Sequence, residues 1–300
     1  MSRKKLFSPS VLLPCAVALL TVCTGCFERE VPHPRVVAHS MAEALQNAGA
    51  VTTLDLHLDG VEGGADGAFE FPEGLERLPA LDFLSVRGRR GLPQIPESIC
   101  AAGKLETLDL AGTGVKTLPE SLGRMPALRR LYLSDNGLAE LPEAVCAIAA
   151  LEYLNLDRNS LTGLPESAGA LPALKWMRLN GNRIGDLPAA AGSGWASIRK
   201  LYLRGNGLRK VPAAILEMKT LEELDLGEND IAELPPALCL LPNLRRLDID
   251  GNPRLAALPA NIGDMKALTH LFAYRCAIPT NEQARVRAAL PDPVRRFIAF

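Results

Sequence analysis

Five carboxylates near the C-terminal third are the residues of this 300-residue chain whose type and spacing best suit chemistry. They are Glu223, Asp225, Glu228, Asp248 and Asp250. Asp225 and Asp248, if held side by side, can transfer a proton in acid–base catalysis or ligate calcium. An acidic patch on a binding surface, beside Arg245 and Arg246, explains the same residues without a cleft, and we favour that interpretation.

Other catalytic patterns are missing from the sequence. It has no P-loop, G-x-S-x-G, H-E-x-x-H or paired C-x-x-C motif. His57 and His270 fall on predicted strands nine steps apart, roughly 43 Å, so they cannot share an active site. The net charge of −1 gives no basic excess for nucleic acid. We expect a non-enzymatic protein with no cofactor and no metal site.

The elements that position these residues follow an internal repeat. One pattern begins at Val51, Leu81, Leu105, Leu128, Leu151, Leu174, Ile198, Leu221, Leu244 and Leu268. After a first step of 30 residues, each step is 23 or 24 residues. The unit is L-x-x-L-x-L-x-x-N-x-L-x-x-L-P, as in Leu128–Pro142. Its L-x-L alternation predicts a short strand with leucines inward, and its Leu-Pro step predicts a turn.

The unit resembles the leucine-rich repeat, in the short form found in Ras-group scaffold proteins and many bacterial repeat proteins. The resemblance implies an α/β solenoid of about ten parallel strands on a concave face, with short helical turns on the convex face. Asparagines at one position of six repeats predict a structural ladder that bonds the backbone of the adjoining coil. They are Asn136, Asn159, Asn182, Asn206, Asn229 and Asn252.

The concave face is the predicted binding surface. Strand residues other than leucine point to it, and all four tyrosines of the chain are among them, although aromatics make up only 5% of residues. Tyrosine, tryptophan and arginine predominate at binding hot spots, although exposed aromatics also stabilise cross-strand packing. The expected contact residues are Arg130, Tyr132, Tyr153, Trp176, Arg178, Lys200, Tyr202, Arg204, Glu223, Asp225 and Asp248.

This face runs from aromatic and basic to acidic, which predicts a protein or peptide partner with its own charge order and a cation preference at the acidic end. The alternative is a carbohydrate or cell-wall ligand, which a flat array of stacked rings would favour. Oligomeric state is left open by the sequence. Cys100, Cys146, Cys239 and Cys276 are predicted to be buried free thiols, because coils two apart separate even the nearest aligned pair by about 10 Å.

The N-terminus has the pattern of an export signal. Arg3, Lys4 and Lys5 precede an apolar stretch that ends in Cys23-Thr-Gly-Cys26 and resembles a bacterial lipobox, although Cys23 stands where leucine is usual. The resemblance implies lipid attachment at Cys26 and a cell-envelope location; an ordinary cleaved signal is the alternative. Phe27 in place of aspartate favours the outer membrane.

The expected organisation along the chain has five parts. Residues 1–26 are the signal, 27–39 a tether, and 40–80 an N-terminal cap with a degenerate first repeat, in which 60–72 form a loop. Residues 81–276 are the repeats and 277–300 the C-terminal cap. Ser40 and Glu43 predict a capped helix over 40–48, and 281–290 an amphipathic helix followed by a last strand.

Overall fold

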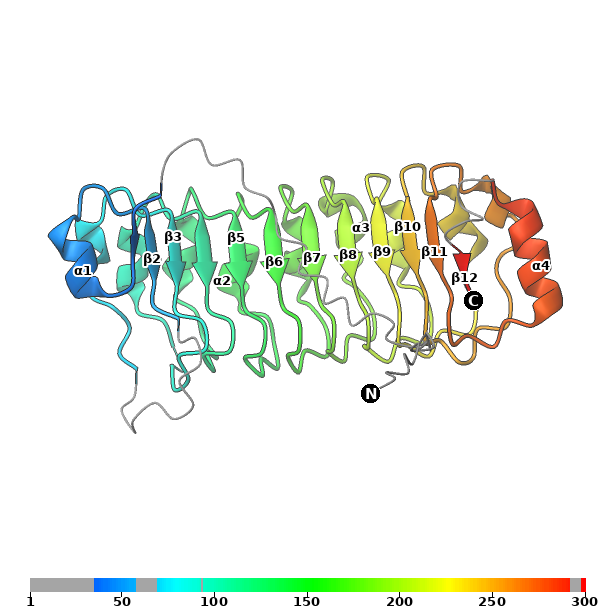
Figure 1. Cartoon of the computed structure of the whole chain (residues 1–300), viewed down its shortest axis with the longest axis horizontal. Coiled ribbons are helices and arrows are strands. Elements are labelled where there is room, and N and C mark those ends of the chain that lie inside the picture. The colour runs from blue at the N-terminus through cyan, green and yellow to red at the C-terminus, as the bar shows by residue number, and fades with distance from the viewer. Residues whose placement is uncertain (1–34, 58–68, 93, 292–297) are drawn as a thin grey trace, which may run out of the picture. The chain divides into compact units, whose positions relative to one another are not determined.

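Twelve short strands form one parallel sheet in the residues that the computed structural model describes: 35–57, 69–92, 94–291 and 298–300. The strands pair strictly in sequence order (Figure 1). They are β1 (Val37–Ala38), β2 (Thr53–Asp55), β3 (Phe83–Ser85), β4 (Thr107–Asp109), β5 (Arg130–Tyr132), β6 (Tyr153–Asn155), β7 (Trp176–Arg178), β8 (Lys200–Tyr202), β9 (Glu223–Asp225), β10 (Arg246–Asp248), β11 (His270–Phe272) and β12 (Ile298–Ala299). This order confirms the predicted solenoid, in which each coil adds one strand.

The sheet is longer than the ten strands expected, because both ends extend it. At the C-terminal end, β12 pairs with β11. At the other end, β1 lies within residues 27–39, where we expect the tether, so that part of the tether prediction is wrong. Val37 pairs with Thr53, and Ala38 is buried in the core at 1% exposure, which draws this segment into the sheet. Residues 1–34, with the expected signal and Cys26, and 60–68 of the expected loop lie outside the described residues.

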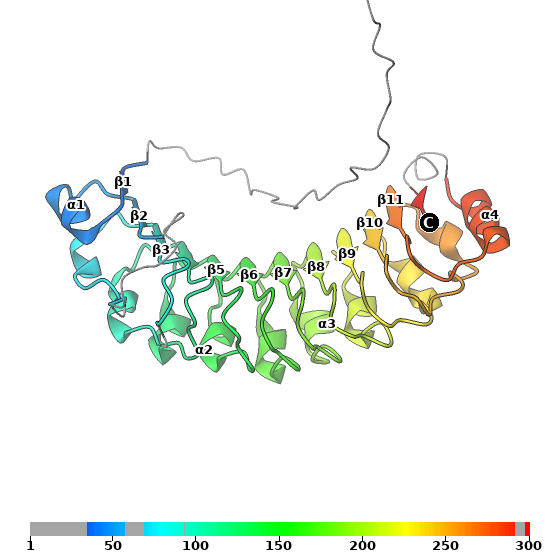
Figure 2. The same ribbon diagram turned by 60° about the horizontal axis from the view of Figure 1, so that its bottom comes forward.

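Short helices cover the convex side of the coils (Figure 2). They are η1 (Leu75–Arg77), η2 (Glu97–Ala101), η3 (Glu120–Arg124), α2 (Glu143–Cys146), η4 (Glu166–Ala170), α3 (Ala191–Gly194), η5 (Ala213–Glu217), η6 (Pro236–Leu240) and η7 (Ile262–Asp264). A proline at the place of the Leu-Pro step, after leucine, isoleucine or valine, directly precedes six of them: Pro96, Pro119, Pro142, Pro165, Pro212 and Pro235. Its fixed φ and missing N–H suit a helix start, so each coil turns at the same place.

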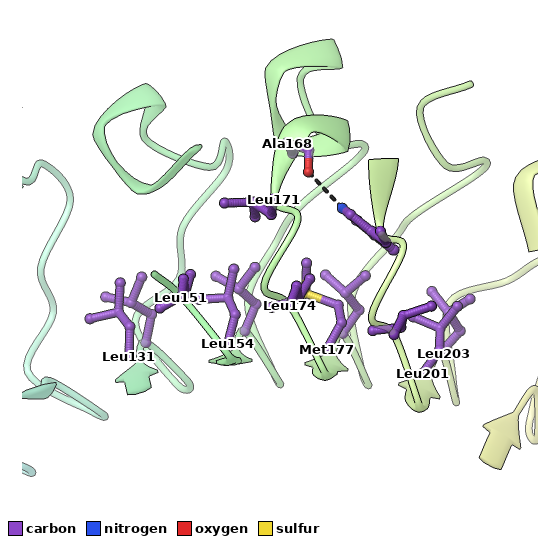
Figure 3. Packing of buried hydrophobic residues seen from close by; sticks show 14 of the residues in the cluster. Leu131, Leu151, Leu154, Ala168, Leu171, Leu174, Met177, Leu201 and Leu203 are labelled. Carbon is purple, nitrogen blue, oxygen red and sulfur yellow. Dashed lines mark hydrogen bonds between the residues drawn. The ribbon is translucent and has the colours of Figure 1, made fainter. Parts of the chain in front are cut away.

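Leucines fill the space between the sheet and the helical layer (Figure 3). Leu131, Leu154 and Leu201 are fully buried, and Met177 takes the same place in β7. The largest fully buried side chain is Trp195, whose Nε1–H donates to the carbonyl of Ala168 at 2.7 Å, the dashed line in Figure 3. This indole packs within the convex layer and joins two consecutive coils.

The six asparagines form a ladder of buried side-chain hydrogen bonds. Asn182 donates from Nδ2 to the carbonyls of Leu156 and Leu179, both at 2.9 Å, and its Oδ1 accepts from the N–H of Leu161 at 3.1 Å. Each amide therefore satisfies backbone groups of its own coil and of the preceding one. The ladder ends at Thr113, whose N–H donates to Asn136.

Replacing Asn182 by alanine is expected to lower the free energy of unfolding by about 1–3 kcal/mol, because buried carbonyls and an N–H lose their partners. Urea unfolding followed by circular dichroism measures the change. Asn243→Ala is the control, since that side chain is exposed and lies outside the ladder. A midpoint for the Asn182 variant equal to that of the control would show that the ladder adds little stability.

Helices close both ends of the described sheet. In α1 (Met41–Gln46), the N–H of Glu43 donates to Ser40 Oγ at 3.1 Å, as predicted for an N-cap. Glu43 accepts in return from the N–H of His39 at 2.8 Å, one residue before the cap, and not from Ser40 as a capping box would have it. Helix α4 (Thr280–Ala289) lies over the last coils. Within it only Val286 is buried, so its apolar contact is narrower than the predicted amphipathic stripe.

All four cysteines of the described coils are free thiols, as predicted. Cys146 and Cys239 are buried, whereas Cys100 and Cys276 are only partly so, which corrects the expectation that all four are buried. Burial raises the pKa of Cys239 to about 11. Among the described residues, no helix combines the length and the apolar character needed to cross a membrane.

Candidate binding surface

The strands place the expected contact residues in two rows on the concave face. In the first row Arg130 lies opposite Tyr153, and Trp176 lies between Tyr153 and Lys200. The second row follows the order Tyr132, Asn155, Arg178, Tyr202, Asp225 and Asp248. Because every register is in step, residues 23 or 24 apart in sequence become neighbours on one surface.

Four aromatic rings form a continuous row, which we call the aromatic ladder: Tyr132, Tyr153, Trp176 and Tyr202. Successive ring centroids are 4.9, 5.1 and 5.8 Å apart, with interplanar angles of 41°, 85° and 55°. Tyr153 and Trp176 are only 6% and 7% exposed, because the rings cover each other. The central rings therefore pack across strands, and the ladder offers a partner its edges and its two outer tyrosines.

Charged side chains lie over the ladder and are paired across strands. The Arg178 guanidinium is 2.6 Å from Asp157 and lies 5.5 Å from the centre of the Tyr202 ring. Lys200 Nζ is 2.8 Å from Glu223 and 4.9 Å from the centre of the Trp176 ring. These pairs hold long side chains in one arrangement, so a partner meets a preorganised surface.

Arg204 belongs to the acidic end of the face. Its guanidinium is 3.1 Å from Asp225, 3.0 Å from Asp248 and 2.5 Å from Asp250, with Glu228 at 3.3 Å. We call these five residues the Arg204 cluster. Arg204 was expected among the basic residues beside the aromatics, and the acidic patch was expected to prefer cationic partners. The guanidinium instead occupies the centre of the carboxylates, so the expected place of Arg204 beside the aromatics is wrong, whereas the cation preference of the acidic end stays a prediction.

The Arg204 cluster also bears on the calcium and acid–base hypotheses for Asp225 and Asp248. The two aspartates lie opposite each other on β9 and β10, as expected. A guanidinium already contacts both, and the described residues contain no group of three or more potential ligands arranged for a metal ion. The pair therefore serves as an ion-pair acceptor.

Asp248, at the end of β10, and Asp250, in the loop after it, have pKa values that are shifted in opposite directions. Burial, aided by a hydrogen bond to Asp250 and the charge of Asp225, raises the pKa of Asp248 to about 7. The pKa of Asp250 is lowered, because the hydrogen bonds from Asp248 and Arg204 outweigh burial. Asp248 thus carries the shared proton, and the pair titrates as a unit.

Replacing Asp248 by asparagine is expected to stabilise the protein by about 1 kcal/mol at pH 8 and hardly at all below pH 4. A carboxyl whose pKa is higher in the folded state stabilises the fold most below its unfolded pKa of 3.8, and this contribution is lost as pH rises towards 7. Asparagine imitates the protonated form at every pH. Urea unfolding of both proteins between pH 4 and pH 8 measures the difference, and a constant difference would contradict the prediction.

From the repeat that begins at Leu81 onwards, the eighth residue of each repeat forms a row beyond the strand ends, which we call the rim. Its members are Gly88, Gly112, Asp135, Arg158, Gly181, Gly205, Glu228, Gly251 and Arg275, and all have φ between 51° and 73°. A non-glycine residue in this left-handed conformation costs about 1 kcal/mol. Asp135 and Arg158 form an exposed ion pair at 2.6 Å, and such a pair contributes about 0–1 kcal/mol. The ion pair therefore does not offset the strain of both residues.

A second exposed aromatic group lies at the C-terminal end of the face. Tyr274 is 58% exposed, and the Arg275 guanidinium lies 5.9 Å from the centre of its ring. Arg246 covers Phe272 at 4.4 Å, and Phe272 stacks on His270 at 6.2 Å. Tyr274 is one of the four tyrosines expected on this face, but neither it nor Phe272 was among the expected contact residues. The repeat in the sequence gives the positions of these two residues, whereas their exposure depends on how neighbouring side chains pack in the structure.

The solenoid keeps the two concave-face histidines apart. His57 follows β2 and contacts Asp55, whereas His270 begins β11. Nine strand-to-strand steps separate these strands in the sheet. The prediction that they do not share a site is confirmed.

Comparison with known proteins agrees with this geometry. The profile of the family described as "Leucine rich repeat" matches residues 149–208 and 196–253. The repeats within residues 149–253 are leucine-rich repeats. Proteins with leucine-rich repeats are typically non-enzymatic scaffolds that commonly bind other proteins. A search of curated proteins found no match.

One solved structure similar to this chain is that of a leucine-rich-repeat protein from Leptospira interrogans. The sequences are 21% identical, and the likeness covers 89% of this chain and 100% of that one. The TM-score of the two structures is 0.38. Its fold is identified by the profile match and by its own parallel sheet.

Proposed function

We propose that this leucine-rich-repeat chain is an exported, lipid-anchored scaffold that binds a protein or peptide on its concave face. The observation that supports the binding surface is the row of cross-strand pairs over β5 to β9, in which tyrosine, tryptophan, arginine and lysine are locked side by side. Binding costs less conformational entropy when such side chains are ordered beforehand. Tyrosine, tryptophan and arginine are also the residues that contribute most at interfaces.

A carbohydrate ligand is the weaker candidate. Sugars stack on exposed, flat aromatic faces, whereas the central rings here are tilted against each other by 41° to 85° and largely covered. The mixed pairs of arginine, lysine and carboxylate suit a protein surface with its own charges.

Capture from a cell-envelope extract tests the concave face. The bait is residues 27–300, which include all of the compact unit 35–300. The variant Tyr132→Ala/Lys200→Ala removes half-buried side chains at both ends of the aromatic ladder and leaves the covered rings in place. Leu240→Ser/Glu166→Ala changes two exposed convex residues and serves as the control.

We expect the wild type and the convex control to capture the same protein and the concave variant to lose it, with equal circular dichroism for all three. Equal capture by the concave variant would place the binding surface elsewhere. Binding on a glycan array that persists in 0.5 M salt, without a captured protein, would favour the carbohydrate alternative, because charge-led protein contacts weaken in salt.

The lipid anchor has its own test, which does not depend on the binding surface. Cells that express the full chain in the presence of labelled palmitate are expected to label it, and Cys26→Ser should abolish the label. Two acyl chains hold a protein stably on a membrane. A processed, unlabelled wild-type chain would show an ordinary cleaved signal, and fractionation of labelled cells would assign the inner or the outer membrane.

A further inference from the structure

The side of the solenoid carries a hollow of about 590 Å³, which we call the side groove. It lies in the three segments that lead from β4, β5 and β6 to the convex helices, and its lining comes from residues 116–120, 139–144 and 162–165. The labels of β5, β6 and α2 mark this part of the chain in Figure 2. None of the residues in its lining belongs to β1–β12, so the side groove is distinct from the concave face.

The side groove exposes two leucines whose counterparts in other coils are covered. The residue before the proline of the Leu-Pro step is only 4–7% exposed in six coils, at Ile95, Leu141, Leu187, Val211, Leu234 and Leu258. At the same step, Leu118 and Leu164 are only partly buried, and both line the groove. Covering this apolar surface by a ligand is favourable, because it removes the surface from water.

Gly163, next to Leu164, leaves the side groove open. A Cβ at this position would meet no heavy atom within 4 Å, and the φ of Gly163 lies outside the left-handed region. Neither packing nor the backbone therefore requires glycine here, and a larger side chain would occupy the groove without disturbing the fold.

Carboxylates surround the apolar part of the lining. Glu120 and Glu140 are exposed, and neither forms an ion pair with another residue of the described chain. Glu143 accepts a hydrogen bond from the uncharged Ser167. Lys116 is the one cation of the lining, and its ammonium group donates to two backbone carbonyls of the next coil at 2.6 and 2.8 Å. The groove thus has three carboxylates and one ammonium group, which gives it a net negative charge.

We propose that the side groove docks a basic segment of a partner protein, in which a lysine or arginine stands beside an aliphatic residue. The aliphatic side chain covers Leu118 and Leu164, and the cation lies against Glu120 and Glu140. The groove is open to solvent and crosses three coils, whereas a site for a small molecule encloses most of its ligand. This surface is additional to the concave face of the proposed function.

Random heptapeptides displayed on phage test the proposal. They are panned on the full chain in detergent and counter-selected on Gly163→Leu, whose new side chain fills the groove. Peptides that bind only the wild type should carry lysine or arginine within two residues of leucine, isoleucine or valine. Gly185→Leu is the matched control, because a Cβ there also meets no heavy atom within 4 Å and Gly185 lies outside the groove. The control should bind the same peptides, and both variants should keep the wild-type denaturant midpoint.

The charge of the groove is tested separately, by fluorescence anisotropy with an enriched peptide. Glu120→Gln/Glu140→Gln should weaken the peptide at least tenfold, because its cation loses both carboxylates. Glu233→Gln is the control: residues 232–235 repeat the Ala-Glu-Leu-Pro sequence of 139–142, and Glu233 is exposed outside the groove. It should leave the affinity unchanged.

Several outcomes would overturn the side-groove proposal. They are the absence of peptides specific to the wild type, enrichment of peptides without a basic residue, and equal affinity of Glu120→Gln/Glu140→Gln and Glu233→Gln. Binding of free spermidine without any enriched peptide would replace the docking surface by a site for a small cation. Tyr132→Ala/Lys200→Ala should not change the peptide affinity; if it does while the glutamine variants do not, the peptides bind the concave face and the side-groove proposal fails.

Discussion

Replacing Trp195 by alanine is expected to lower the free energy of unfolding by about 4 kcal/mol. The indole is fully buried in the convex layer, and its removal leaves a cavity between two coils. The carbonyl of Ala168 also loses its 2.7 Å hydrogen bond. Because each coil of a solenoid contacts only its neighbours, a cavity at this junction weakens the link between the two halves of the array.

Guanidinium unfolding followed by circular dichroism measures this loss. Trp195→Phe is the informative control, since it keeps an aromatic ring in the same place and removes the hydrogen bond with only part of the ring volume, for an expected loss of about 1–2 kcal/mol. A midpoint for Trp195→Ala equal to that of Trp195→Phe would show that the convex layer collapses into the space. A decrease in the slope of the transition would show that the two halves unfold separately.

Replacing Arg204 by alanine is expected to cost about 3 kcal/mol at pH 8, because it leaves several half-buried carboxylates without their common cation. Asp225, Asp248 and Asp250 each contact the guanidinium within 3.1 Å and are at most 16% exposed in their side chains. Without it, mutual repulsion favours their protonated forms. The loss should therefore shrink towards pH 5, where Asp248, with a pKa of about 7, is already protonated in the wild type.

Urea unfolding at pH 5 and pH 8 measures the Arg204 effect. Arg209→Ala changes a nearby exposed arginine and should be close to neutral at both pH values. An equal loss at the two pH values would mean that Arg204 stabilises the fold by packing of its alkyl chain, and the electrostatic explanation of the cluster would be wrong.

The repeat explains why so much of the fold was predictable. One strand per period makes residues 23 or 24 apart neighbours, so sequence spacing translates directly into sheet position. The asparagine ladder, the unpaired cysteines and the pairing of Asp225 with Asp248 all follow from this translation. The strand that was missed lies where the period is weak, at β1, whose two residues carry no recognisable repeat.

The left-handed conformation of the rim was only partly predictable from the sequence. Glycine at the eighth position of five repeats is visible in the sequence and indicates a positive φ there. The same spacing also places the charged residues Arg158 and Glu228 in this row, which the repeat pattern alone does not distinguish from ordinary residues of the face. Their conformation is what separates them from other surface charges.

The sequence by itself determined the coil, its register and the identity of the side chains on each face, because these depend only on period and alternation. Only the tertiary structure decided which of those side chains remain available. Tyr153 and Trp176 are covered by neighbouring rings, and Arg204 reaches across two coils to Asp250. A side chain longer than the spacing between strands can turn to either neighbour, and the balance of desolvation, ring packing and charge among several coils selects one arrangement.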